Sequence, residues 1–240
     1  MNLVYEGINL DIVHAIKEAK TLIVERKAEK ASELLTNALT FIQAQSEEDM
    51  GGQENKLVLE AGIHENLGDA KIIAQRDQEA LSHLLMSLTQ LQTLESISEN
   101  SAIDPLFRVY RKMAGAFQRL GQQFENEKYL RKAGDIKASI LKKELYARFS
   151  DAGYKIEEDV RAVESEVSPV DILAIKGSLR KKRIAIWFAM DDSEVDTIAF
   201  ITRGYAKFAN SRYILLLMGQ ATIPTIQGVA IISSIDDIKM

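Results

Sequence analysis

The sequence predicts an α + α/β chain with an N-terminal helical-repeat domain, residues 1–140, and a C-terminal small mixed-sheet α/β domain, residues 141–240. Two observations predict this class. As far as Phe149, apolar residues recur every three or four positions, which is the period of an amphipathic helix. After Phe149 they come in short β-branched runs, as in buried strands.

The composition and the first residues also indicate which kinds of site and segment the chain lacks. The 240 residues contain no cysteine, which excludes disulfides and thiolate sites. No run of 18 apolar residues occurs, so the sequence predicts no membrane span. The first residues carry acids where a signal peptide carries bases, and we therefore expect a cytoplasmic protein.

The helical half is predicted to contain six helices. A polar stretch with Gly51 and Gly52 separates the second helix from the third. Asp104 and Pro105 are expected to open the fifth helix, with Asp104 as its N-cap. The expected segments are Ile12–Ile23, Ala31–Ile42, Lys56–Arg76, Gln78–Leu94, Asp104–Gln122 and Asn126–Phe149.

Small residues recur in these helices at a spacing that resembles tetratricopeptide repeats. The three windows contain Ala15, Ala19, Leu22, Ala31, Leu35 and Ala38, then Leu67, Gly68, Ala80 and Leu84, then Tyr110, Met113, Ala114, Phe117, Gly121, Leu130 and Ala133. The anchors Ala19, Gly68 and Ala114 are 49 and 46 residues apart, whereas tetratricopeptide repeats have a period of about 34 residues. The resemblance covers about 120 residues and implies a protein-binding repeat array. A generic helical bundle is the alternative.

The second half begins with a helix that ends at Gly153, the position expected for a left-handed cap. A basic turn, Gly177–Arg183, joins two apolar runs into a hairpin, and Ser193 is expected to begin a helix that reaches Asn210. The expected strands are Lys155–Val163, Val170–Ile175, Ile184–Phe188, Tyr213–Met218 and Gly228–Ser233.

This order, with the turn Gly153-Tyr154 and with Asp171 at the start of a strand, resembles the restriction-endonuclease-like superfamily. The superfamily signature is PD…(D/E)-x-K. The resemblance covers residues 140–240 and implies that an acid and a lysine should occupy positions 187 and 189. Those positions hold Trp187 and Ala189.

The resemblance therefore implies a nuclease-like domain without its catalytic pair. In active members two acids hold a divalent metal and the lysine orients the attacking water. Asp171 alone holds Mg²⁺ poorly, so we expect no metal and no cofactor. Asp191 or Asp192 could replace the lost acid, which is one alternative. A turn cap or a salt bridge is the other interpretation of Asp171.

Charge is divided unevenly along the chain. Residues 1–100 have a net charge of −9, from 17 acids and 8 bases, and residues 101–150 have a net charge of +6, from 11 bases and 5 acids. A basic stripe of this kind can bind phosphates. Contact with the acidic first hundred residues, or a solvated face, is the alternative. The nucleic-acid candidates are Arg108, Arg111, Lys112, Arg119, Lys128, Arg131, Lys132, Lys181, Lys182 and Arg183.

Together these patterns predict a non-catalytic adaptor. Its repeats would bind a protein partner, and the nuclease-like domain would be a docking surface, with nucleic acid as a candidate ligand. The alternatives are a metal-dependent nuclease that uses Asp171 with Asp191 or Asp192, and an α/β domain that makes homo-oligomers. His14, His64 and His83 are interpreted as structural residues, since their spacing does not match a metal site.

Overall fold

A computed structural model describes residues 10–160, 170–177, 182–189, 211–218 and 227–239. The chain forms two compact units, Met1–Ala133 and Gly134–Met240, called here the helical unit and the sheet unit. The border between them lies inside one long helix, α6, whose residues belong to both units. Each unit is described by itself.

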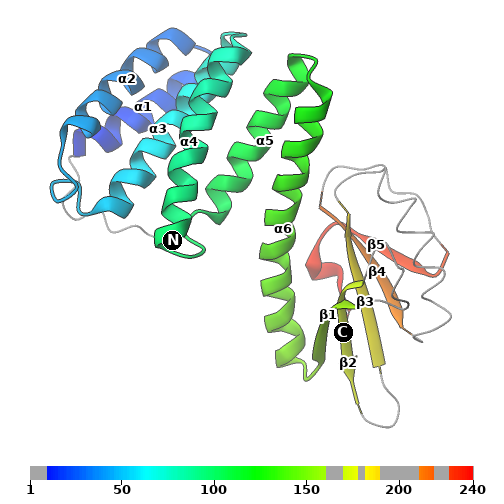
Figure 1. The fold of residues 1–240 in the computed structure, drawn as a ribbon. Coiled ribbons are helices and arrows are strands. Elements are labelled where there is room, and N and C mark those ends of the chain that lie inside the picture. The colour runs from blue at the N-terminus through cyan, green and yellow to red at the C-terminus, as the bar shows by residue number, and fades with distance from the viewer. Residues whose placement is uncertain (1–9, 161–169, 178–181, 190–210, 219–226, 240) are drawn as a thin grey trace. The chain divides into compact units, whose positions relative to one another are not determined.

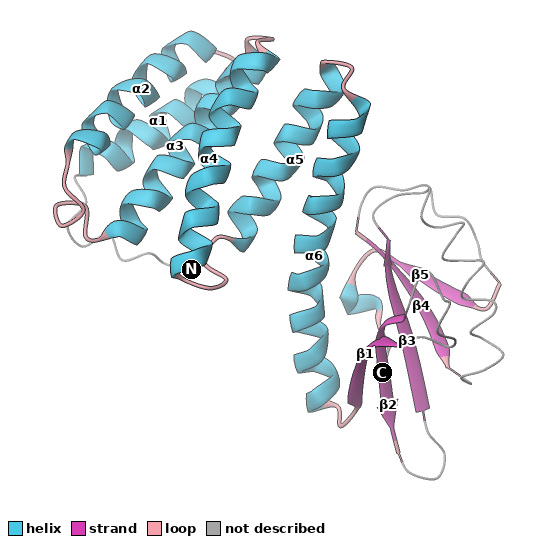
Figure 2. Ribbon diagram, in the orientation of Figure 1, coloured by secondary structure: helices cyan, strands magenta, loops and turns pink. Residues whose placement is uncertain are grey.

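Three helical hairpins follow one another in the described part of the chain that precedes the sheet (Figures 1 and 2). Their helices are α1 (Leu10–Val24), α2 (Ala28–Ala44), α3 (Gln53–Ile73), α4 (Asp77–Ile97), α5 (Ile103–Arg119) and α6 (Gln123–Asp151). From α1 to α5 each helix packs against the next, and the first helices α1 and α3 also contact each other. The array is therefore a stack in which each hairpin covers its neighbour.

The three hairpins turn in the same way. At the end of α1, Arg26 adopts a left-handed φ of 59°, its N–H donates to the carbonyl of Ile23, and the Lys27 N–H donates to the carbonyl of Leu22. This pair of bonds is a Schellman cap. Gln75 and Gly121 repeat both the left-handed φ and the two hydrogen bonds after α3 and α5. Three equivalent turns show that the hairpins are structural repeats of one another.

The two helices of each hairpin cross closely at small residues. Ala19 and Ala31 are fully buried in the first hairpin, as is Ala80 in the second. In α3, a Cβ placed on Gly68 would lie 2.9 Å from Cδ2 of the buried Leu84 side chain on α4. The small anchors predicted from sequence, Ala19, Gly68 and Ala114, each precede the left-handed residue of their turn by seven positions. The small anchor therefore lies at the same distance from the turn in all three hairpins.

The core of the helical unit runs across the hairpin borders. One buried cluster joins α1, α2 and α3, so the first hairpin is stabilised by apolar contact with the second. Its buried members are Ile12, Ala19, Leu35, Ala38, Ile42, Met50, Leu59, Ile63 and Leu67. Met50 belongs to the connection before α3, which shows that this polar loop is anchored by one apolar side chain.

The predicted N-cap of the fifth helix is wrong. Helix α5 begins at Ile103, its cap residue is Ala102, and Asp104 lies within the first turn. The side chain of Glu95 on α4 takes over the capping task, because its carboxylate accepts the backbone N–H groups of Asn100 and Ala102 at 2.7 and 3.0 Å. Asp104 in the first turn still complements the positive end of the helix dipole.

The sheet unit contains a five-stranded mixed sheet in the order β1-β2-β3-β4-β5. The strands are β1 (Lys155–Val160), β2 (Val170–Lys176), β3 (Lys182–Ala189), β4 (Arg212–Leu217) and β5 (Val229–Ile232). The first three pair antiparallel, and β4 and β5 run parallel to β3. The predicted hairpin and the mixed sheet are thus confirmed.

Both faces of the central strands carry buried apolar residues. On one face, Leu145 and Phe149 of α6 pack with alternate residues of β2, β3 and β4, including Ile172 and Ile186. Leu173, Ala185, Trp187 and Leu215 belong to a separate cluster. Gly153 ends α6 with a left-handed φ of 76° and the same Schellman hydrogen bonds, as the sequence predicted.

The predicted fold class is confirmed: the N-terminal part is helical and the C-terminal part is a small mixed sheet covered by α6. The helix expected over Ser193–Asn210 lies outside the described residues. Helices α3 and α6 each begin three residues earlier than the apolar periodicity predicted. Apolar spacing shows that a helix is present, but it does not determine at which residue the helix begins or ends.

The close crossing at Gly68 predicts opposite effects for two glycine substitutions in α3. Gly62→Ala should raise the free energy of unfolding by about 1 kcal/mol, because nothing lies within 4 Å of the new Cβ and alanine favours helix. Gly68→Ala should make the protein less stable than Gly62→Ala by about 1–3 kcal/mol, because its Cβ overpacks against Leu84. Urea denaturation of the full chain measures both, and equal stabilisation would disprove the tight crossing.

Candidate functional sites

Asp171, the residue that resembles the first nuclease acid, lies near the start of β2. Its Oδ2 accepts the backbone N–H of Phe188 on β3 at 2.9 Å. Its Oδ1 lies 3.8 Å from Nζ of Lys142 on α6, and both side chains are about a quarter exposed. The last paired residues on this side of the β2–β3 ladder are Ile172 and Ile186, so the carboxylate satisfies an N–H just beyond the ladder. Asp171 therefore ties together β2, β3 and α6.

The two positions expected to carry the acid and the lysine lie in the core. Trp187 is 1% exposed, Ala189 is fully buried, and both belong to the cluster with Leu173 and Leu215. The Trp187 ring stacks on Tyr213 of β4 with centroids 5.9 Å apart. Packing residues therefore fill both positions.

The structure does not test the relocated metal site. Asp191 and Asp192 lie outside the described residues. Among the residues that the structure does describe, no three acidic, histidine or cysteine side chains are grouped in a way that could hold a metal ion.

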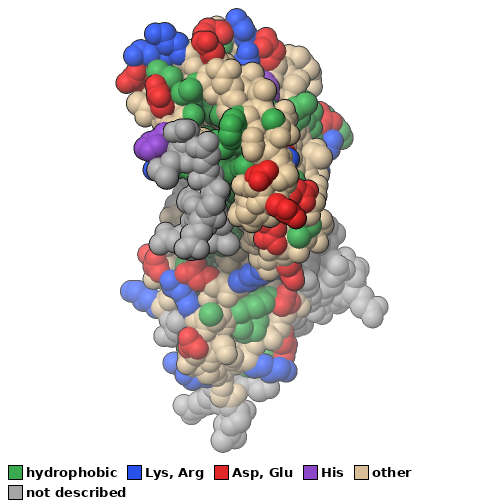
Figure 3. All heavy atoms as spheres, turned by 90° about the vertical axis from the view of Figure 1, so that its left-hand side faces the viewer, with side chains coloured by type: hydrophobic (Ala, Val, Ile, Leu, Met, Phe, Trp, Pro, Cys, Tyr) green, Lys and Arg blue, Asp and Glu red, His purple; other side chains and the backbone are tan. Residues whose placement is uncertain are grey.

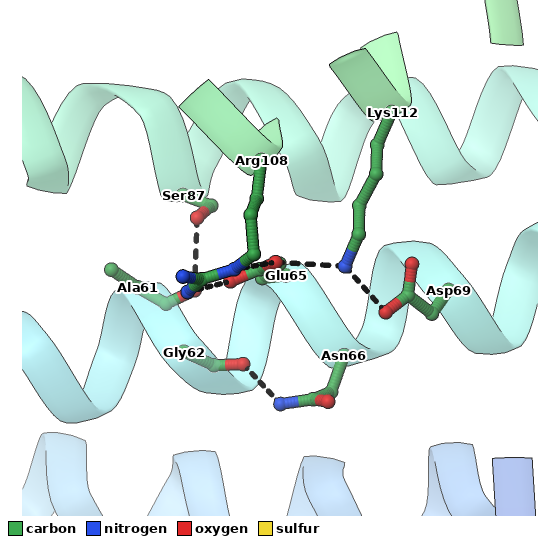
Figure 4. Close-up of polar contacts among 8 residues, drawn as sticks. All are labelled: Ala61, Gly62, Glu65, Asn66, Asp69, Ser87, Arg108 and Lys112. Atoms are coloured by element: carbon green, nitrogen blue, oxygen red, sulfur yellow. Dashed lines mark hydrogen bonds and ion pairs between the residues drawn. The ribbon is translucent and has the colours of Figure 1, made fainter. Parts of the chain in front are cut away.

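Two of the predicted phosphate-binding cations are engaged inside the helical unit. Arg108 and Lys112 on α5 both bond to Glu65 on α3, at 3.1 and 2.7 Å, and Lys112 also reaches Asp69 at 2.6 Å (Figure 4). We call these four residues the ion cluster. It connects the first helix of the second hairpin with the first helix of the third.

Burial and charge act on the two carboxyl groups of the ion cluster in opposite senses. At Glu65 burial raises the pKa, but the hydrogen bond from Arg108 and the charge of Lys112 outweigh it and hold the pKa below its ordinary value. At Asp69 burial is the larger effect and leaves the pKa raised despite Lys112. Glu65 is thus the anionic centre of the cluster, and its side chain is only 10% exposed.

The remaining candidate cations have varied surroundings. Arg119 pairs with Asp77 on α4 at 2.8 Å, and Lys128 pairs with Glu125 within α6. Arg111 and Lys132 lie over the aromatic rings of Phe107 and of Tyr110 and Tyr129. Arg131 and Lys182 are exposed, Arg183 is half-buried, and Lys181 lies outside the described residues. Nucleic-acid binding by the candidate cations stays a prediction. Three of them, Arg108, Lys112 and Arg119, contact acids of the first hundred residues, which was the alternative interpretation.

The structure also brings together two histidines that the sequence analysis treated separately. Nδ1 of His64 on α3 lies 3.3 Å from Nδ1 of His83 on α4, and the rings stack. Burial lowers the pKa of His64 to about 4, with a further contribution from His83. Burial and the charge of Lys71 lower the pKa of His83. A 19-residue separation with a turn between them carries no recognisable motif, so the pair could be found only from the structure.

The sequence analysis missed the partners of its own candidates. It identified Asp171, Arg108 and Lys112, but not Lys142, Glu65 or Asp69 as their partners. The net charges of −9 and +6 in neighbouring segments were the available signal, and they indicate a pairing without saying which residues pair.

Comparisons with known proteins give one structural likeness. No family model and no curated protein matches the chain. The crystal structure of the tetratricopeptide-repeat domain of Arabidopsis FLU is similar to 51% of this chain, over 91% of its own length, with 20% sequence identity and a TM-score of 0.42. None of the described helices is long and apolar enough to cross a bilayer.

The histidine pair predicts a loss of stability in acid. Because both folded-state pKa values lie below 6.5, the unfolded chain binds more protons between about pH 6.5 and 4. Stability should therefore fall as the pH drops through this window, by about 1.4 kcal/mol per pH unit for each proton that the fold excludes. Urea denaturation at several pH values should show a shallower slope for His64→Gln with His83→Gln. The exposed His14→Gln is the control, and an unchanged slope in the double variant would contradict this origin.

The ion cluster predicts a difference between buried and exposed carboxylates. Glu65→Gln should lower the free energy of unfolding by about 1–3 kcal/mol, because two cations lose a charged acceptor. The matched control is Glu29→Gln, which removes the partner of Arg76 from a pair with side chains 70% and 46% exposed. That change should cost less than about 1 kcal/mol. Equal losses in thermal or urea denaturation would show that the cluster is not a stabilising contact.

Proposed function

We propose that the chain is a non-catalytic adaptor whose helical unit binds a segment of a protein partner. The observation that supports this most is the connection between the first helices of successive hairpins. Helix α1 packs on α3, and the ion cluster links α3 to α5. Three helices held in this way form a continuous surface whose side chains lose little further freedom when a partner binds.

The sheet unit would be the second docking element, with a nuclease-like fold that has lost its chemistry. Two features support this part of the proposal. Trp187 and Ala189 are buried in an apolar cluster. Asp171 is already bonded to Phe188 N–H and faces Lys142. Similarity of fold alone would not establish a nuclease function.

The adaptor proposal is tested by crosslinking the tagged full chain to proteins in an extract of its source cells. A specifically captured partner should crosslink to lysines of the helical unit, such as Lys30 and Lys56. Lys155 and Lys239 of the sheet unit provide the internal comparison. Crosslinks found only on the sheet unit would overturn the assignment of the helical unit as the protein-binding element.

A second candidate is a metal-dependent nuclease that uses Asp171 with Asp191 or Asp192. The observation in its favour is the position of Lys142 on α6, whose ammonium group lies 3.8 Å from the Asp171 carboxylate. The signature of the nuclease-like family has no lysine on this helix. Such a group could orient a water molecule beside a bound metal.

We expect the purified protein to leave DNA and RNA intact with either Mg²⁺ or Mn²⁺, since the β3 positions supply neither ligand nor lysine. The matched variants are Asp171→Asn, which keeps an oxygen for the Phe188 N–H, and Lys142→Ala. Cleavage by the unmodified protein that both variants abolish would establish the nuclease and refute the adaptor proposal for the sheet unit. Cleavage that is equal in all three proteins would come from a contaminant.

A further inference from the structure

A pocket of about 520 Å³ opens where the first two hairpins turn. It is lined by residues of the α1–α2 turn, the start of α2 and the α3–α4 turn. Four cationic side chains stand around it, Arg26, Lys27, Lys30 and Arg76, with Glu29 as the acidic member of the lining. The lining therefore contains four cationic side chains and one acidic side chain.

Two of these cations are already paired, and two are not. Lys27 bonds to Glu25 at 2.7 Å, and Arg76 bonds to Glu29 at 3.1 Å. Neither Arg26 nor Lys30 makes an ion pair within the described part of the chain. The positive charge that remains available to a ligand therefore resides on Arg26 and Lys30.

The cations of this pocket stand out against an acidic background. The first hundred residues contain only 8 bases against 17 acids, yet four of those bases line this one pocket. Figure 3 shows Lys and Arg side chains, interspersed with acidic ones, at the upper end of the helical unit. A cationic pocket on an otherwise acidic surface attracts anions there and repels them elsewhere.

The pocket also has an apolar lining, which limits the class of ligand. Ala28 is buried, and Ile73 and Ala74 are half-buried at its wall. An inorganic anion would make no use of these groups. A peptide segment that combines carboxylates with an apolar side chain would satisfy both, and the volume suits one or two side chains.

We infer that this pocket binds an acidic segment of a protein partner, with carboxylates beside Arg26 and Lys30 and an apolar side chain against Ile73. The inference rests on the proposed function and names the chemistry of the partner. Because the contacts are exposed ion pairs, binding weakens as salt is raised.

The test uses the full chain and a fluorescein-labelled, glutamate-rich decapeptide that carries two leucines. A copy with glutamine in place of glutamate is the uncharged probe. Arg26→Asn with Lys30→Gln removes both unpaired charges, and asparagine tolerates the left-handed backbone at position 26. The matched control, Lys17→Asn with Lys20→Gln, also removes two positive charges, from exposed residues of α1 outside the pocket.

In fluorescence anisotropy, the acidic probe should bind more tightly than the uncharged one, and the pocket variant should bind it about five- to ten-fold more weakly, as expected for two exposed ion pairs. The control variant should keep its affinity. If both probes bind equally to all proteins, the pocket inference fails and the proposed peptide binding stands. If neither probe binds, both fail for this class of partner. Sedimentation that shows self-association abolished by the pocket variant would make the occupant a second copy and overturn the inference.

Discussion

The close crossing of the two helices within each hairpin is the constraint on which the helical unit depends. Helices can approach this closely only where side chains are small, as at Gly68 against Ala80 and Leu84, and Ala19 and Ala31 are fully buried in the first hairpin. The crossing point lies seven residues before a left-handed turn in all three hairpins, so it also sets where the chain reverses. The connections between hairpins do not take part in these crossings, so their lengths can differ. The distance between successive anchors is therefore 49 residues and then 46 residues.

Stacking these hairpins determines where the charges of the chain can meet. Because α3 and α5 lie side by side, the acids of the second hairpin face the bases of the third, and Glu65 receives both Arg108 and Lys112. Arg108, Lys112 and Arg119 are thus neutralised by acids of the first hundred residues. Arg26 and Lys30 have no acid partner of this kind among the described residues, and they lie where the α1–α2 turn, the start of α2 and the α3–α4 turn line one pocket.

The sequence predicts the features that arise from local periodicity. It does not predict the features that depend on a residue far away in the chain. The six helices, the β2–β3 hairpin and the Gly153 cap follow from apolar spacing and from a glycine where the backbone is left-handed. The turns at Arg26 and Gln75 have the same backbone without a glycine, so no residue type marks them. Asp104 was assigned as a cap because nothing local shows that Glu95 already holds the loop. Pairs such as His64 with His83 depend on how helices stack, which composition does not encode.

Asp171 shows why a matching motif residue can be kept for a structural reason. Its carboxylate bonds the Phe188 N–H just beyond the β2–β3 ladder and pairs with Lys142, so removing it would leave both without a partner that they now have. Positions 187 and 189, where the resemblance implies an acid and a lysine, are also occupied by packing residues. An acid at position 187 and a lysine at 189 would place two ionisable groups in a cluster where Trp187 is 1% exposed and Ala189 is fully buried. Burying such charges costs several kcal/mol each unless they are paired. The core of the sheet unit is therefore incompatible with an acid at position 187 and a lysine at position 189.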